Sequence, residues 1–97
     1  MWRHSALAAL LFPLIADAAS EYMMTQCSVR AEAIQFLAEE RDRGASFQET
    51  MNNINSRTSG EMRETLLSYA SQVYALKSQS PTYFAALTLQ ECLRRYD

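Results

Sequence analysis

The sequence predicts an all-α protein, a small antiparallel bundle of four helices, the second one short, that follows a cleaved signal peptide. Apolar residues recur at three- and four-residue steps in four separate stretches, and helix-start signals precede these stretches. No stretch alternates apolar and polar residues with the period of two that marks a strand. A chain of 97 residues has room for one domain. We therefore expect a signal peptide over 1–18 and a single helical domain over 19–97.

The N-terminal segment has the pattern of a signal peptide. After a short, positively charged start, residues 5–15 form the apolar run SALAALLFPLI, which is too short to span a bilayer as a helix. Ala16 and Ala18 place small residues at the two positions that a signal peptidase inspects, which predicts cleavage between Ala18 and Ala19. An uncleaved N-terminal anchor or a core helix is the alternative. We expect an exported protein, in the bacterial periplasm first and otherwise secreted.

The central element is a helix predicted over residues 21–43. This stretch contains no Gly or Pro, and its apolar positions share one side of the helix. That side carries Met23, Cys27, Ala31, Ile34, Ala38 and Arg41. Ser20 is a candidate N-cap, and Gly44 can end the helix in the left-handed conformation. A long helix with one apolar side needs a cover, so the later segments must pack against it.

Three shorter helices follow, each opened by a serine-based signal. Ser46 and Glu49 fit a capping box, and the stretch Thr58-Ser59-Gly60-Glu61 repeats the pattern. Ser80 followed by Pro81 predicts an N-cap and a first helical residue. The expected ranges are about 47–54, 59–77 and 81–96. The apolar positions expected to pack are Phe47, Met51, Ile54, Met62, Leu66, Ala70, Val73, Leu76, Phe84, Ala85, Leu89, Cys92, Leu93 and Tyr96.

Cys27 and Cys92 are the two cysteines of the chain, and export predicts a disulfide between them. In a bundle of four antiparallel helices, the start of the first helix and the end of the last lie at the same end, at similar heights. Such a bond closes most of the mature chain into a loop and stabilises it by roughly 4 kcal/mol. Two free thiols or a bond between chains are the alternatives.

The mature chain lacks the residues that most catalytic and metal sites need. The only histidine of the full sequence, His4, lies in the predicted signal peptide, so cleavage removes the commonest general base and metal ligand. Ser-His-Asp and Cys-His nucleophile systems and structural zinc sites are excluded on this ground. The net charge of −2 is made of interspersed acids and bases, which gives nucleic acid no binding patch. We expect no enzyme, no cofactor, no metal and no membrane span after cleavage.

Two groups of side chains invite a functional interpretation and have a simpler one. The carboxylates at 39, 40 and 42 are flanked by Arg41 and Arg43, which favours local ion pairs at a solvated helix end over an acid/base pair. Met23 and Met24 beside Cys27 offer soft ligands for copper(I), although core packing and a disulfide explain them more simply.

Arginines and tyrosines form the remaining candidates. Arg30 and Arg41 lie close to the apolar side of the first helix and are placed to pair with carboxylates of later helices. Those carboxylates are Glu61, Glu64 and Glu91. The five tyrosines are suited to a binding patch, but tyrosines more often bury the ring and keep the hydroxyl in water, which we expect for at least three of them.

The Gly44-Ala45-Ser46 turn and the closing segment LQECLRRY give the chain a recognisable layout. It resembles small exported bacterial all-helical proteins of uncharacterised function, with one cysteine early in the first helix and one late in the last. The periplasmic acid-stress chaperones of the HdeA type are similar in form only, and no activity is implied by the resemblance. We expect contact with another protein or self-association. Binding of a small ligand or metal in the bundle is the alternative.

Intact mass spectrometry of the protein from the cell envelope, with and without reductant, tests export and the disulfide together. We expect a chain that begins at Ala19 and gains two hydrogens on reduction. A mass that still includes residues 1–18 would contradict the cleavage. Equal masses before and after reduction would contradict the disulfide.

Overall fold

Four helices make up the computed structural model, which describes the backbone of residues 2–95 and the side chains of residues 20–95. They are α1 (Trp2–Asp42), α2 (Phe47–Arg57), α3 (Gly60–Ala75) and α4 (Pro81–Arg94). No strand occurs within the described residues. The predicted all-α class and the antiparallel bundle of four helices with a short second member are confirmed.

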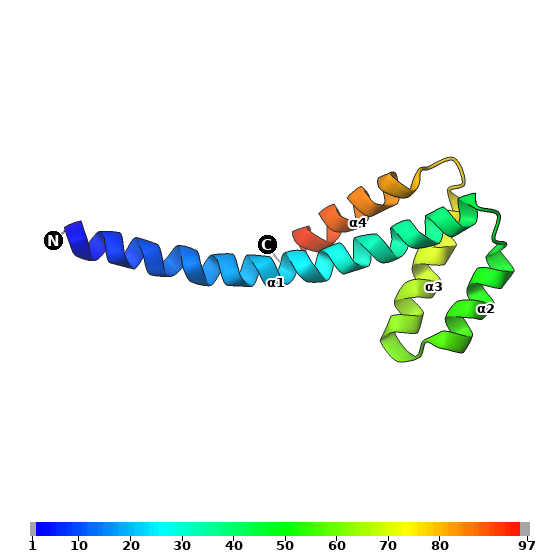
Figure 1. Cartoon of the computed structure of the whole chain (residues 1–97), viewed down its shortest axis with the longest axis horizontal. Coiled ribbons are helices and arrows are strands. Elements are labelled where there is room, and N and C mark those ends of the chain that lie inside the picture. Colours follow the sequence, from blue (N-terminus) through cyan, green and yellow to red (C-terminus); the bar gives the residue numbers. More distant parts are fainter. Residues whose placement is uncertain (1, 96–97) are drawn as a thin grey trace.

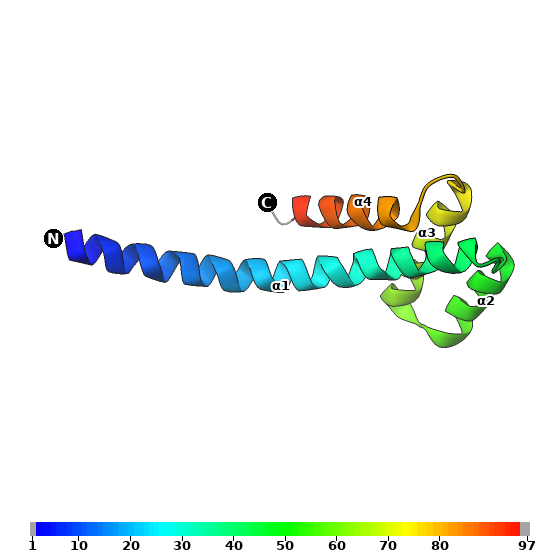
Figure 2. The same cartoon turned by 45° about the horizontal axis from the view of Figure 1, so that its top comes forward.

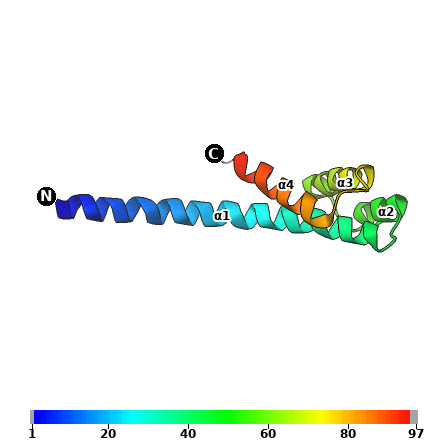
Figure 3. The ribbon, with the colours of Figure 1, turned by 90° about the horizontal axis from the view of Figure 1, so that it is seen from above.

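The long helix α1 is the support on which the other three are arranged. α4 runs back alongside α1 in the opposite direction, and the hairpin of α2 and α3 lies at the C-terminal end of α1 (Figures 1 and 2). α1 packs against α4 and α3, while α2 packs mainly against α3. Seen from above, the N-terminal half of α1 projects beyond the rest of the chain (Figure 3). Because α2 packs mainly against α3, it is attached to the rest of the fold chiefly through α3.

The start of α1 differs from the prediction, and its end agrees. Ser20 is not an N-cap, because the helix continues through it from Trp2. The segment 16–20 contains three alanines and no glycine or proline, so nothing in it interrupts helical hydrogen bonding. At the other end Gly44 has φ +105°, and the Ala45 amide donates to the Glu40 carbonyl over 3.0 Å. This Schellman motif needs the left-handed conformation that glycine adopts without strain.

The capping predictions hold for α2 and α4 and are wrong for α3. Ser46 and Glu49 form the predicted capping box, and the hydrogen bonds from Ser46 lower the pKa of the Glu49 carboxyl. The Ser80 hydroxyl accepts from the Tyr83 amide. Ser59, the N-cap of α3, makes no side-chain cap bond. The preceding Thr58 instead donates its hydroxyl to the Ile54 carbonyl and ends α2.

The core lies where α1, α3 and α4 meet, and α2 adds one residue to it. Its buried members are Ile34, Leu37, Ala38, Ile54, Ala70, Val73 and Phe84. Phe84 is the largest side chain that is almost fully buried. The predicted apolar face of α3 is buried only in its middle, because Met62 and Leu76 at its two ends are about half exposed or more. The core is small, so hydrogen bonds at the helix ends and the disulfide add to the stability that its burial supplies.

Arg41, at the end of α1, holds the junction of three helices. Its guanidinium donates to the carbonyl of Val73 over 2.6 Å and to that of Gln79 over 2.7 Å, and more weakly to that of Leu76. These carbonyls belong to the last turn of α3 and to the linker that leads into α4, where the helix dipole is negative. The same guanidinium lies 5.7 Å from the centre of the Phe84 ring.

A second arginine caps a helix in the same way. Arg63, from the first turns of α3, donates to the carbonyls of Thr58 and Asn55 at the end of α2. Tyr74 ties the opposite end of the hairpin, since its hydroxyl lies 2.6 Å from the Ala45 carbonyl and 2.9 Å from the Thr50 hydroxyl. Orphan carbonyl groups at the ends of α2 and α3 are thus satisfied by side chains from neighbouring elements.

Replacing Arg41 by alanine tests the junction. Because the side chain is only 7 % exposed and bonds three carbonyl groups, we expect Arg41→Ala to lower the free energy of unfolding by about 3 kcal/mol in urea titration. The matched control is Arg43→Ala, whose ion pair with Glu40 is exposed and should contribute less than about 0.5 kcal/mol. Equal losses in the two variants would contradict this role.

Candidate functional site

The two cysteines form the predicted disulfide. Cys27 of α1 and Cys92 of α4 are bonded, with their Cα atoms 5.5 Å apart. Both residues are buried, and the bond fastens the last turns of α4 to the middle of α1. Because Cys27 is used in this bond, it has no free thiolate for the copper(I) site considered from the sequence. The disulfide is therefore structural in character.

The acidic end of α1 is arranged as the simpler interpretation predicted. Glu40 pairs with Arg43 over 2.9 Å, and Asp42 pairs with Arg41 over 2.8 Å. Both pairs are local, between neighbours on the same helix or its end. They leave no pair of facing carboxylates here that resembles an acid/base site.

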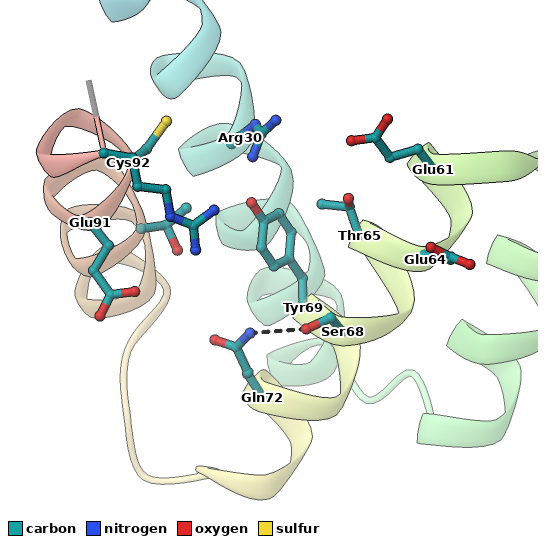
Figure 4. Close-up of a pocket in the computed structure, with 11 residues that line it drawn as sticks. Arg30, Glu61, Glu64, Thr65, Ser68, Tyr69, Gln72, Glu91 and Cys92 are labelled. Atoms are coloured by element: carbon teal, nitrogen blue, oxygen red, sulfur yellow. Dashed lines mark hydrogen bonds between the residues drawn. The ribbon is translucent and has the colours of Figure 1, made fainter.

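A cleft of about 420 Å³ lies between α3 and α4, with Arg30 of α1 in its lining. Because polar side chains line most of it, we call it the polar cleft. Figure 4 shows the side chains of Arg30 and Tyr69 extending into the space between the two helices. Three carboxylates share the lining: Glu61, Glu64 and Glu91. One wall also carries the disulfide through Cys92, so the cleft sits beside the most firmly tied part of the fold.

The ion pairs predicted between Arg30 or Arg41 and the carboxylates of later helices do not form within residues 20–95. Arg41 bonds the end of α3 instead of a carboxylate of another helix, because uncapped and partly buried carbonyl groups lie within its reach. Arg30 does line the polar cleft with the three predicted carboxylates, but no ion pair joins it to them within residues 20–95. The cleft thus gathers charges of both signs that are not locked to one another.

A second surface lies between the other side of α1 and the hairpin, and we call it the apolar groove. It consists of two adjoining hollows of about 410 and 460 Å³ that share Ala33 of α1 and Leu66 of α3. Phe36 lines one hollow, and Val29 and Met62 line the other. Phe36, Val29 and Met62 are 55 %, 58 % and 64 % exposed. Apolar side chains are therefore concentrated on a face that no side chain of residues 20–95 covers.

The sequence carried a signal for this surface that the prediction missed. Tyr22, Val29 and Phe36 are seven residues apart, so they share one side of α1, distinct from the side that carries Cys27 and Ile34. A surface helix normally has one apolar stripe that faces the core, whereas this helix has two stripes on different sides. Only the stripe with Cys27 and Ile34 is buried.

The tyrosines divide between packing and exposure. Tyr69 and Tyr74 are half-buried, while Tyr22 and Tyr83 are exposed. Tyr96 lies outside the described residues. Two of the four described tyrosines are thus half-buried, and the expectation of at least three stays a prediction. Tyr83 packs edge-on against Phe84, with ring centres 5.4 Å apart, whereas Tyr22 shares the stripe of α1 that carries Val29 and Phe36, so the two exposed tyrosines do not form one patch.

Three predicted positions fall where the structure gives only backbone. Ala16, Ala18 and Ala19 are in α1, and their side chains lie outside the described ones. The cleavage between Ala18 and Ala19 stays a prediction.

Among the helices that the structure describes, none has both the length and the apolar character needed to cross a bilayer. Within the same residues, no three His, Cys, Asp or Glu side chains are grouped to hold a metal ion.

No family model, curated protein or solved structure matches this chain. Any function must therefore be argued from the surfaces themselves.

Two phenylalanines offer a matched test of the apolar groove. Phe36→Ser changes a side chain that is 55 % exposed, so we expect the free energy of unfolding to change by less than about 0.5 kcal/mol. Phe84→Ala removes a side chain that is 1 % exposed and should lower it by about 4 kcal/mol. A large loss for Phe36→Ser would show that this ring serves the fold rather than an interface.

Proposed function

We propose that this is a non-catalytic exported protein that acts through contact with another protein, as an envelope accessory, an inhibitor or immunity-type binder, or a chaperone-like factor. The observation that carries the proposal is the apolar groove. Its walls include Val29, Phe36 and Met62, which remain largely exposed although the chain buries a small core elsewhere. Exposed apolar surface of this kind is costly to keep in water unless a partner covers it.

The composition and the covalent frame support the same proposal. Removal of residues 1–18 takes away the only histidine, which leaves carboxylates, tyrosines and Lys77 as the acid/base side chains. The Cys27–Cys92 bond fits an oxidising compartment such as the periplasm or the exterior. A disulfide and arginine caps at helix ends also keep a small domain rigid, and rigid binding surfaces lose less entropy on association.

A second candidate function rests on the polar cleft. Its volume of about 420 Å³ is sufficient for a small ligand, and Arg30, Tyr69 and three carboxylates offer donors and acceptors. A molecule with both a cationic and an anionic group would match this lining. The cleft is open and lined mainly by polar and charged side chains, so the ligand would be held by polar contacts rather than by apolar burial.

Photo-crosslinking inside the intact envelope tests the proposal. A photoreactive residue at position 36 reports on the apolar groove, and one at position 91 reports on the polar cleft. We expect one dominant protein adduct, or a defined set of adducts, from position 36. The yield of this adduct should fall in the Met62→Ser variant, because Met62 lies in the same groove.

The outcomes separate the two candidates. Adducts formed only from position 91, together with a small molecule that copurifies and is released by Arg30→Gln, would replace protein contact with ligand binding. Protein adducts that grow in number at low pH would make the protein chaperone-like. An absence of protein adducts at position 36 under all growth conditions would contradict the proposal.

A further inference from the structure

We propose that the apolar groove binds a basic amphipathic helix of a partner protein. This inference rests on the proposed function and adds the chemical nature of the partner. It is carried by three properties of the groove: the spacing of its apolar residues, the adaptability of its walls, and the charge on its rim.

The spacing along α1 fits a helical partner. Val29, Ala33 and Phe36 follow one another at four and three residues, and Tyr22 precedes Val29 by seven. Alternation of three- and four-residue steps is the pattern with which one helix receives the side chains of another. All four residues are exposed or half-buried, so this stripe is free to receive such side chains.

The opposite wall is adaptable. α3 contributes Met62, which is 64 % exposed, and Leu66, which is half-buried. Met24, also exposed, lies in a shallow hollow beside Val29. Methionine side chains are flexible and polarisable, which suits surfaces that must fit apolar groups of differing shape. The groove can therefore accept a helix whose apolar face varies in detail.

The rim of the groove is acidic at the end nearer the start of the mature chain. Glu21 and Glu32 line the shallow hollow with Val29, and Glu61 lines the next hollow with Met62. All three carboxylates are exposed, and none is in an ion pair within residues 20–95. These acidic groups predict lysine or arginine beside the apolar face of the partner.

Basic residues near the groove are fewer than these carboxylates, and one of them, Arg30, lines the same hollow as Glu61. Arg30 borders the hollow of Met62 but also lines the polar cleft, and Arg57 borders the hollow of Phe36 at the far end. A parallel pairing of two copies through this surface would bring the three carboxylates of each copy toward those of the other. An antiparallel pairing would place them near Arg57, which offers one positive charge for three negative ones. Charge therefore favours a basic partner over a second copy.

A synthetic peptide tests the inference. From Glu21 to Phe36 α1 rises about 22 Å, so a helix of about 15 residues spans the surface. The probe is a peptide of that length with leucine at helical three- and four-residue steps and lysine elsewhere. Its controls are a scrambled peptide of equal composition and a peptide with glutamate in place of lysine. Fluorescence anisotropy with the protein purified from the envelope, its disulfide intact, gives the affinities.

We expect binding of the lysine peptide alone, with an affinity that falls as salt is added. The double variant Glu32→Gln/Glu61→Gln should weaken binding about tenfold, since two charge pairs are lost. The matched control, Glu64→Gln/Glu91→Gln, changes two carboxylates that line only the polar cleft, and should leave the affinity unchanged. Phe36→Ser should weaken binding, whereas Leu87→Ser, on the exposed side of α4, should not.

Several results would overturn the inference, and they differ in what they mean for protein contact itself. Equal binding of lysine and glutamate peptides, or no effect of the Glu32/Glu61 double variant, overturns it. Dimerisation that is abolished by Phe36→Ser would make a second copy the occupant. No peptide binding, with a single protein still crosslinked from position 36, would leave protein contact standing with a partner of other chemistry. If no peptide binds and no protein is crosslinked from position 36, both this inference and the proposed function are overturned.

Discussion

The fold depends on the hydrogen bonds that the Arg41 guanidinium gives to the end of α3 and to the α3–α4 linker. Packing alone is a weak constraint here, because the core has few large side chains and Phe84 dominates it. An arginine fork satisfies several orphan carbonyl groups at once and fixes their direction. The end of α3 and the linker before α4 are thus held against α1 by one residue of α1, through contacts more than thirty residues apart in the chain.

The disulfide adds a constraint at the opposite end of α4. With Arg41 holding the linker before α4 and Cys92 bonded to Cys27 near its end, α4 is fastened to one side of α1 at two points. The hairpin is held at the C-terminal end of α1 through α3. This arrangement covers one apolar stripe of α1 and leaves the other stripe exposed as a wall of the apolar groove. The surface proposed for binding follows from how the helices are fastened.

Local sequence patterns predicted the helices and the disulfide well. Apolar spacing, the capping box of Ser46, the Ser80–Pro81 start and Gly44 each act through neighbours in the chain, so their geometry can be deduced from sequence. The role of Arg41 could not be deduced, because its acceptors are backbone carbonyls that lie together only after folding. The groove was missed for a related reason: the spacing of Val29 and Phe36 reveals a second stripe, but only the tertiary arrangement shows which stripe is covered.

Hydroxyl-radical footprinting of the purified protein tests most directly whether the groove is open in solution. It compares two residues of the same type on the same molecule, Phe36 in the groove and Phe84 in the core. An open groove predicts rapid oxidation of Phe36, and of Met62 beside it, with Phe84 protected until the protein unfolds. Protection of Phe36 and Met62 equal to that of Phe84 would contradict the account, because the groove would then already be covered in the isolated protein.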